Sequence, residues 1–469
     1  NAGILPALRS CWTGGRGPLI FRAVQARMPR MFRSPHDDIR RWLHEEDWVR
    51  AGCTAGALLA ANPGDLVAWQ MAASALLGLG RTAEGAAGLR ECSEAALETG
   101  NLPLALTCHA SLRQAGEEAS GILDRAASLY HRGSSRVRRE LRLAPPLPAD
   151  PVETTACADE AAAAERAVAG VRKARDQHAL DRSMAFEPAP LPSFPLLGSL
   201  CEPNLRAVLE RMDAVYAPPG GALLEQGAEG DAVFVVLCGR GDVVRRSRSG
   251  EETILRRVLP GGVVGEIALV TRAPRVASVR TEDGLLALKL PGAVVEELAD
   301  LEPGLAEEMI GFCRERMLAN LVEASPLLRR IDEGTRAGVL ASFDRVMAPA
   351  GTVLVRQGEE SPGLFVIVVG GAEVVREDGS GGDGIRLAQL GPADVFGEMS
   401  LLLRRPAGAG VRAMYDTALL RLPRERFMPV VEAHPGLLAE LYRLAGEREE
   451  ETRSLLGRPS ESVDDLTLM

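Results

Sequence analysis

The sequence predicts an α+β multidomain protein in which N-terminal α-helical hairpins precede two β-roll (jelly-roll-like) domains with flanking helices. The chain has 469 residues, which is too long for one ordinary core and suggests about three domains of roughly 150 residues each. Its N-terminal part shows helical apolar spacing. Its C-terminal half contains a long internal repeat of short apolar runs separated by glycine turns, which is typical of small antiparallel rolls.

The overall composition excludes several classes of protein. Apolar residues make up 46% and charged residues 25%, as in soluble globular proteins. A net charge of -10 argues against nucleic acid as a partner, because such a partner needs concentrated positive potential. No run approaches the ~18 uninterrupted apolar residues of a membrane helix, so we expect no membrane span. The eight cysteines are scattered singly without zinc spacing, so we expect no metal, no disulfide framework, and reduced thiols in a cytoplasmic protein.

The N-terminal residues divide into a basic leader and a helical domain. Residues 1–36 contain six Arg and no acidic residue, which superficially resembles a targeting peptide; we expect a disordered leader instead. Residues 37–135 have helical periodicity, with breaks at 61–65, 78–81 and 98–101. Five positions loosely resemble a tetratricopeptide repeat: Trp69, Ala72, Leu76, Gly80 and Ala86. This domain is either a groove for a protein partner or a plain helical domain.

Residues 136–190 are predicted to be a Pro-rich linker that carries a helix. Proline-rich flanks extend the chain, whereas the Ala-, Glu- and Arg-rich stretch from Cys157 to Arg182 consists of strong helix formers. A charge-laced helix of this kind is usually an exposed spacer, although it could pair with another copy of the chain.

The internal repeat defines the two rolls. Residues 217–244 align without gaps on residues 348–375, and each copy has the order of turn, short strand, Gln-Gly and apolar run. We place the rolls at 191–322 and 323–446, followed by a polar tail at 447–469. The expected flanking helices are Cys201 to Met212, Val294 to Leu321, Asp332 to Phe343 and Arg424 to Glu450. The glycine-rich stretch at 378–384 lacks the lysine of a phosphate loop and is predicted to be a hairpin tip.

A motif late in the first roll points to a ligand. The stretch "VGEIALVTRAPRVASV" at 264–279 resembles the phosphate-binding cassette of the cyclic nucleotide-binding domain family, whose approximate pattern is F-G-E-L-A-L, four variable residues, then P-R-A-A-T-V. It departs mainly at Val264, Val276 and Ser278. The resemblance implies that this roll binds cAMP or another cyclic nucleotide, with no metal.

The chemistry of such a ligand accounts for the residue types. Glycine lets the backbone approach the sugar, and amides at the start of the following short helix suit an anion. By resemblance, Arg275 would bind the phosphate, Glu266 the ribose 2′-hydroxyl, and the amides of Ala268 and Val276 would complete the cradle. The expected ligand-binding set is Gly265, Glu266, Ile267, Ala268, Pro274, Arg275, Val276 and Ala277. The alternative is that Glu266 and Arg275 pair with each other in a roll that binds nothing.

The second cassette, "FGEMSLLLRRPAGAGV" at 396–411, is predicted to be degenerate. Its positions are Gly397, Glu398, Met399, Ser400 and Ala407, with Ala407 where the family has arginine. Losing a partly desolvated Arg–phosphate pair costs on the order of 2–5 kcal/mol, or roughly thirty-fold to several-thousand-fold in affinity. Unless Arg404 or Arg405 reaches in, we expect a silent site on a roll that serves dimerisation or coupling.

These observations predict a regulatory sensor rather than an enzyme. No nucleophile elbow or metal cluster is visible, and the six His lie far apart. Val276 offers no hydroxyl to guanine where the family can have Thr, so cAMP is favoured over cGMP. Occupancy of the first roll would move the helices after Pro291 and reposition either the second roll or the helical domain 37–135. The signal would pass to an unidentified protein partner, for which residues 37–135 are a candidate surface. A homo-oligomer stays open, and the alternative function is a scaffold that binds no nucleotide.

Overall fold

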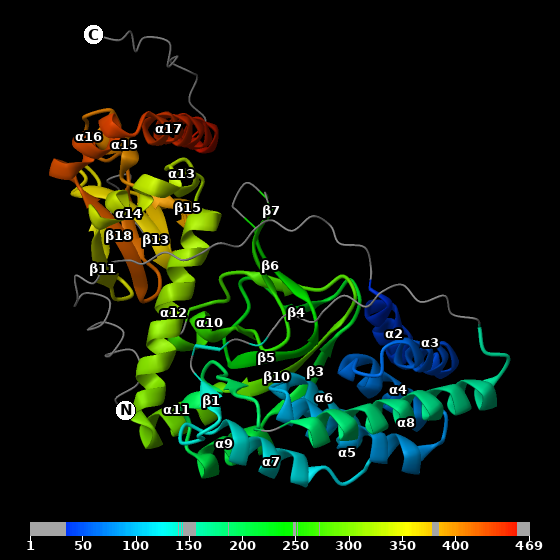
Figure 1. Cartoon of the computed structure of the whole chain (residues 1–469). Coiled ribbons are helices and arrows are strands. Elements are labelled where there is room, and N and C mark those ends of the chain that lie inside the picture. Colours follow the sequence, from blue (N-terminus) through cyan, green and yellow to red (C-terminus); the bar gives the residue numbers. More distant parts are fainter. Residues whose placement is uncertain are drawn as a thin grey trace.

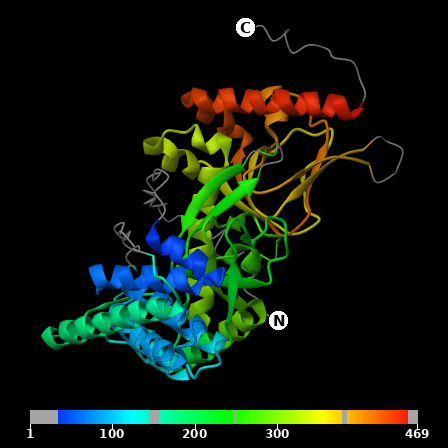
Figure 2. The same ribbon diagram turned by 90° about the vertical axis from the view of Figure 1, so that its right-hand side faces the viewer.

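The computed structural model describes residues 34–138, 140–141, 143, 156–185, 187–246, 250, 252–271, 273–377 and 384–456. It confirms the predicted fold class, with a helical region followed by two β-rolls and their helices. Figure 1 shows the long helix α12 (Pro303–Ala324) running from the first roll to the second. The helical region and the C-terminal helix α17 (Pro435–Leu456) lie at opposite ends of the molecule (Figure 2).

The helical region is built from short antiparallel helices with Ala-rich contacts. Asp47, Asp65 and Asn101 cap three of them by accepting from backbone amides in the first turn. The elements are α2 (Pro35–His44), α3 (Trp48–Ala61), α4 (Leu66–Gly78), α5 (Thr82–Glu98), α6 (Leu102–Gln114) and α7 (Ser120–Tyr130). Trp69, Ala72 and Leu76 are buried in α4, and Ala86 is buried on α5. The expected hairpins are therefore present, while the tetratricopeptide resemblance stays a prediction.

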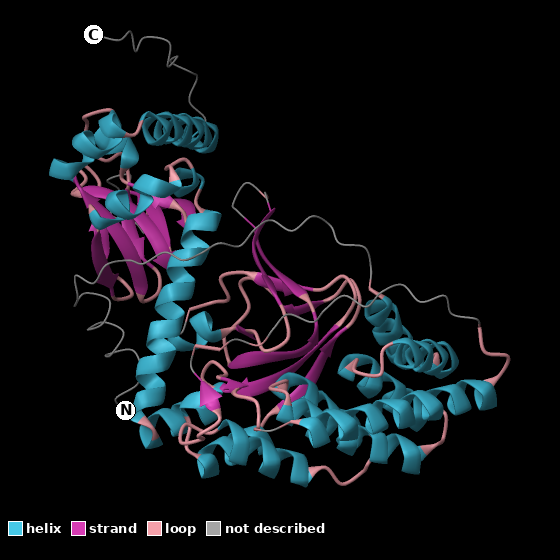
Figure 3. Cartoon of the chain, in the orientation of Figure 1, coloured by secondary structure: helices cyan, strands magenta, loops and turns pink. Residues whose placement is uncertain are grey.

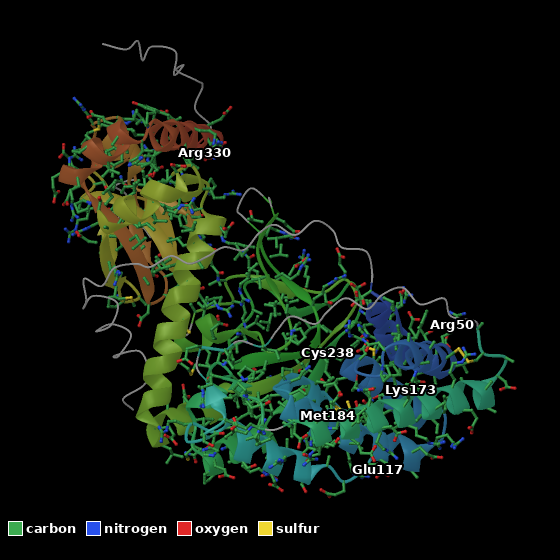
Figure 4. The ribbon with its side chains drawn as sticks, in the orientation of Figure 1. Arg50, Glu117, Lys173, Met184, Cys238 and Arg330 are labelled. Atoms are coloured by element: carbon green, nitrogen blue, oxygen red, sulfur yellow. A yellow bond between two sulfur atoms is a disulfide. The ribbon has the colours of Figure 1, made fainter. Side chains whose placement is uncertain are left out.

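Helix α8 (Glu160–Met184) corrects the expectation of an exposed spacer. Its small side chains at three and four spacing form one buried face: Ala163, Ala164, Ala167, Gly170, Val171 and Ala174. A Cβ on Gly56 would lie 2.6 Å from the carbonyl oxygen of Arg166, so only glycine allows α3 to approach α8 this closely. Lys173 on α8 also donates to the carbonyl of Ala60 at 2.5 Å (Figure 4). The predicted helix thus belongs to the core of the helical region.

The packing of α8 also corrects the expectation of reduced thiols throughout. Cys53 on α3 and Cys157, three residues before α8, form a disulfide with their Cα atoms 6.0 Å apart. The two cysteines are 104 residues apart in sequence, and only the return of α8 along α3 brings them together. In the part of the chain that the structure describes, five other cysteines are free: Cys92, Cys108, Cys201, Cys238 and Cys313.

Helix α2 joins the helical region to the first roll. It begins at Pro35 behind a capping box on Ser34, so residues 34–36 of the predicted leader belong to this helix and its cap; residues 1–33 lie outside the described residues. His36 contacts Asp65 of α4 at 2.8 Å, whereas Asp37 lies 3.5 Å from Arg240 next to β5. The two contacts fix α2 between the helices and the roll.

Each roll consists of two antiparallel four-stranded sheets within the described residues (Figure 3). In the first roll the sheet orders are β3-β10-β5-β8 and β4-β9-β6-β7. Its elements are β3 (Asp213–Ala217), β4 (Ala222–Leu224), β5 (Ala232–Gly239), β6 (Gly241–Arg246), β7 (Glu252–Val258), β8 (Val263–Val264), α10 (Glu266–Thr271), β9 (Ser278–Arg280) and β10 (Leu285–Pro291). Strand β5 is almost continuously buried because helix α6 covers one side of it and the opposite sheet covers the other.

The second roll repeats this topology, with sheet orders β11-β18-β13-β16 and β12-β17-β14-β15. Its elements are β11 (Asp344–Ala348), β12 (Val353–Val355), β13 (Gly363–Val369), β14 (Ala372–Arg376), β15 (Ile385–Leu390), β16 (Val395–Phe396), α15 (Glu398–Leu402), β17 (Gly410–Ala413) and β18 (Thr417–Pro423). Strands β14 and β15 pair as a hairpin. The predicted hairpin tip at 378–384 lies outside the described residues except for Gly384.

The flanking helices differ from their predicted bounds at prolines. They are α9 (Glu202–Glu210), α11 (Gly292–Leu301), α12, α13 (Pro326–Arg329), α14 (Glu333–Ala341), α16 (Arg424–Ala433) and α17. A 3-10 turn covers Leu197–Ser199, and the short strands β1 (Val137–Arg138) and β2 (Leu191–Pro192) pair in parallel. Pro303 and Pro435 each start a new helix, so the single helices expected after each roll are two. Helix α17 continues ten residues past the predicted roll boundary at 446. Before that boundary, Arg330 lies beside α17 (Figure 4), 3.6 Å from Glu440.

Two absences hold for the described ranges. No helix there combines the length and the apolar composition needed to cross a lipid bilayer. In the same part of the chain, no cluster of three or more His, Cys, Asp or Glu side chains could hold a metal ion.

Candidate nucleotide-binding site

The first cassette, residues 264–279, is held in shape by its backbone. Gly265 links β8 to α10 at a φ of +90°, a conformation that L side chains rarely adopt. A Cβ at this position would lie 2.7 Å from Nη1 of Arg275, so the glycine also leaves room for the guanidinium. At the other end of the cassette, the amide of Gly227 donates to the carbonyl of Arg275, and the amide of Arg275 donates to the carbonyl of Ala228, both at 2.8 Å. The arginine backbone is therefore pinned to the turn after β4.

The guanidinium of Arg275 is buried against main-chain oxygens. The side chain is 5% exposed, and it donates to the carbonyls of Gly265 at 2.7 Å and Ala232 at 2.9 Å. Asp231 lies 3.6 Å away but is 62% exposed, so solvent weakens this ion pair. Burial lowers the pKa of Arg275, and the charges of Asp231 and Glu266 offset only part of that effect. An anion with hydrogen-bond acceptors would stabilise this buried cation.

Glu266, the first residue of α10, acts on further titratable groups besides Arg275. It is 2% exposed, and its carboxylate acts on Arg256 of β7 and on the thiol of Cys313 on α12. Burial and the neighbouring Arg316 lower the pKa of Arg256 to about 9, although Glu266 works in the opposite direction. Among the described residues no ion pair joins Glu266 to Arg275. The alternative in which these two groups simply pair with each other is therefore not what the structure shows.

A small cavity of about 20 Å³ lies next to the cassette. Ile267 and Val276 line it from the cassette, and Met317 and Leu321 line it from α12. Its remaining wall includes Val368, Pro392 and Ala393 of the second roll, together with Arg245 and Leu255 of the first roll and Asn320 and Ala324 of α12. Sequence reasoning missed the wall residues on α12 and on the second roll, because no motif spacing connects them to the cassette.

The other predicted ligand residues do not line the cavity but pack within the cassette. Ala268 and Ala277 are buried, and Pro274 is half-buried directly before Arg275. A Cβ on Gly230 would overlap the side chain of Ala268, so the loop before β5 packs directly on α10. The structure thus brings Gly265 and Arg275 into contact and places Ile267 and Val276 at the cavity.

The second cassette keeps the backbone but changes the side chains. Gly397 has a φ of +89°, and the amide of Gly358 donates to the carbonyl of Ala407 at 2.8 Å, as the amide of Gly227 does to Arg275. Glu398 accepts from Arg448 of α17 at 2.7 Å. Arg405 reaches Glu449 of α17 at 3.4 Å, and Arg404 is exposed at a φ of 48°.

Two further changes accompany the loss of the arginine. Gly230 and Asp231 of the first roll correspond to Ser361 and Pro362, so the acidic neighbour of the guanidinium is absent from the second roll. The hydroxyl of Ser361 donates to the carbonyl of Gly363 at 2.8 Å, and Gly363 is the counterpart of Ala232. Ser361 therefore satisfies the same carbonyl that Arg275 satisfies in the first roll.

Comparisons with known proteins show which domain family the two rolls match. The model of the cyclic nucleotide-binding domain family matches residues 214–301 and 345–434. The cAMP-dependent protein kinase regulatory subunit of Dictyostelium discoideum is 29% identical over 234 residues, which are 50% of this chain and 69% of that protein. Lysophospholipase NTE1 of Coccidioides immitis (strain RS) is 24% identical over 304 residues, or 56% of this chain, but the chain spans only 18% of it. Among solved structures, the catabolite activator protein of Thermus thermophilus is 32% identical over 28% of this chain and 62% of its own, with a TM-score of 0.27.

The class of protein follows from the fold, the cassettes and the matched family. The chain carries two cyclic nucleotide-binding domains in tandem. In this arrangement it resembles the regulatory subunits of cAMP-dependent protein kinases, with a helical region in front of the two domains.

Proposed function

We propose that the chain is a cyclic nucleotide sensor in which the first roll binds the ligand and the second roll does not. The observation that carries this proposal is the buried guanidinium of Arg275, held by two neutral carbonyls and one largely exposed carboxylate. A cyclic phosphate supplies the charge that this guanidinium lacks nearby.

We assign the ligand contacts by resemblance to the family; Arg275 and Glu266 are buried within the cassette and are not among the residues that line the cavity. Arg275 would hold the exocyclic phosphate, and Glu266 would accept from the ribose 2′-hydroxyl. The base would lie beside Ile267 and Val276 of the cassette, which border a small apolar cavity. We favour cAMP over cGMP because Val276 has no hydroxyl to offer to guanine, and the name of the Dictyostelium relative supports the same ligand.

The proposed output is a protein partner rather than a reaction of the chain itself. The Dictyostelium relative is a kinase regulatory subunit by name, which supports a kinase as one class of partner. Helix α2 connects β5 of the first roll to the helical region through Asp37 and His36, so a movement of the roll would reach that region directly.

Titration of the full chain with cAMP and cGMP, followed by thermal shift and calorimetry, tests the proposal. We expect cAMP to stabilise the chain and Arg275→Leu to weaken binding by roughly thirty-fold to several-thousand-fold. Arg405→Leu is the matched control, because it removes an arginine from the second cassette and should leave binding unchanged. Absence of binding at millimolar ligand would leave the scaffold function instead.

A further inference from the structure

The two sulfurs of the Cys53–Cys157 disulfide have different surroundings. Cys53 lies within α3 and is 3% exposed. Cys157 lies before α8 and is partly exposed, and Ala156 and Ala158 on either side of it are exposed. A small molecule in the solvent therefore reaches the bridge at Cys157 and not at Cys53.

A guanidinium contacts the buried sulfur. Nη1 of Arg166 on α8 lies 3.0 Å from Sγ of Cys53. An arginine beside a sulfur stabilises the thiolate of that sulfur, and a more stable thiolate is the better leaving group in thiol–disulfide exchange. The contact therefore favours cleavage of the bridge in the direction that releases Cys53.

Helix α8 has contacts of its own that hold it on α3 when the bridge is open. Asp159 caps the helix by accepting from a backbone amide in its first turn. Further along, Lys173 donates to the carbonyl of Ala60 at 2.5 Å. A Cβ on Gly170 would lie 3.1 Å from Cα of Gly56, so the two helices pack backbone against backbone. Opening of the bridge thus frees the start of α8 and leaves the folded helix in place.

We propose that the Cys53–Cys157 bridge is an exchangeable disulfide and that Cys157 is a site of reversible S-thiolation by a small thiol such as glutathione. The thiolate of glutathione attacks Sγ of Cys157 and forms a new sulfur–sulfur bond with it. The bond to Cys53 breaks, and its electron pair leaves on Cys53 as a thiolate beside Arg166. A second glutathione thiolate displaces Cys157 and departs as oxidised glutathione, so that the bridge is reduced by two electrons and two glutathione molecules are oxidised.

Trapping of the mixed disulfide on the full chain tests the point of attack. The folded chain is incubated with millimolar reduced glutathione without oxygen, quenched with N-ethylmaleimide in denaturant, and mapped by peptide mass spectrometry. We expect glutathione on Cys157 and the maleimide on Cys53 in the same molecules. Glutathione on Cys53 with the maleimide on Cys157 would overturn the proposal.

The rate at which glutathione opens the bridge tests the role of Arg166. We expect the bridge of Arg166→Met to open about tenfold more slowly than that of the unaltered chain, and Arg166→Lys to restore part of the rate because it keeps the positive charge. A merely structural role of Arg166 would have the opposite sign, since looser packing would expose the bridge and speed its opening. Arg172→Met is the matched control, because Arg172 is exposed on the same helix, and its rate should equal that of the unaltered chain.

The outcomes distinguish an exchangeable bridge from a purely structural one. Glutathione on Cys157 together with slower opening of Arg166→Met would support the proposal. Equal or faster opening of Arg166→Met, or a bridge that resists glutathione while the chain stays folded, would overturn it. Should Arg166→Met fail to fold, the position of the glutathione adduct decides the question. No nucleotide enters these measurements, so the proposed function stands or falls separately.

Discussion

The side chains of the second cassette predict that Ala407→Arg alone does not restore nucleotide binding. In the first roll, Nη1 of Arg275 lies 2.7 Å from the position that a Cβ on Gly265 would occupy. In the second roll, the hydroxyl oxygen of Ser361 lies 2.7 Å from the corresponding position on Gly397. Because Ser361 also satisfies the carbonyl of Gly363, the hydroxyl occupies the place that an introduced guanidinium needs.

The size of the effect follows from two contributions. Forcing a guanidinium beside the buried Ser361 is overpacking, which typically costs about 1–3 kcal/mol. The introduced charge would also lack an acidic neighbour, because Pro362 stands where the first roll has Asp231. Two unit charges 3.6 Å apart attract by about 5 kcal/mol at an effective dielectric constant of ~20, but the exposure of Asp231 reduces its contribution to about 1 kcal/mol. Together the two contributions weaken binding by roughly thirty-fold to a thousand-fold.

Calorimetric titration with cAMP in an Arg275→Leu background isolates the second site. We expect no binding from Ala407→Arg alone, and measurable binding once Ser361→Gly and Pro362→Asp are added to it. The stoichiometry should then be one ligand per chain. If Ala407→Arg alone bound as tightly as the triple variant, the reasoning about Ser361 and Pro362 would be refuted.

Three further predictions concern the cassette glycine, the disulfide and acid stability. Gly265→Ala should weaken cAMP binding more than tenfold and destabilise the chain by about 1–2 kcal/mol. Gly220→Ala is its control, because Gly220 also has a positive φ of +75° but a Cβ there would meet no atom within 4 Å. The control should lower stability in thermal unfolding and leave cAMP binding unchanged. Dithiothreitol should lower the melting temperature of the unaltered chain but not that of Cys157→Ser. For a bridge of this span, reduction should lower the free energy of unfolding by about 2–4 kcal/mol. An equal shift of both melting temperatures would contradict the bridge. Burial alone would raise the pKa of Asp65, but the hydrogen bond to His36 and those from backbone amides hold it below its ordinary value. The ionised carboxylate of Asp65 therefore stabilises the fold at a pH above the ordinary pKa of aspartate, and this stabilisation is lost as pH falls through the lowered pKa. On acid titration below pH ~4, the free energy of unfolding of Asp65→Asn should fall less than that of the unaltered chain.

The cassette could be located from the sequence because its residues are close together along the chain. The spacing from Gly265 through Glu266 to Arg275 is a local property of one turn, the short helix α10 and the loop that follows it. The same is true of the missing arginine at Ala407. Ser361 and Pro362 could have been found as well, since the gap-free alignment of the two rolls already pairs them with Gly230 and Asp231.

The helix α8 shows where sequence reasoning reached its limit. Its helix-forming residues predict the element correctly, but its charges suggested an exposed spacer. The buried face of alanines and glycine becomes meaningful only when Gly56 of α3 is known to lie opposite. The partner of Cys53 depends on the same long-range packing.

The sequence by itself determined the two rolls, the cassette in each and the loss of the arginine in the second, because periodicity and motif spacing depend on near neighbours along the chain. Only the tertiary structure decided that α8 belongs to the core, that Cys53 meets Cys157, and that Arg245 and Ala393 meet at one cavity. These contacts join residues more than 100 positions apart, and burial between distant segments leaves no local pattern from which it could be read.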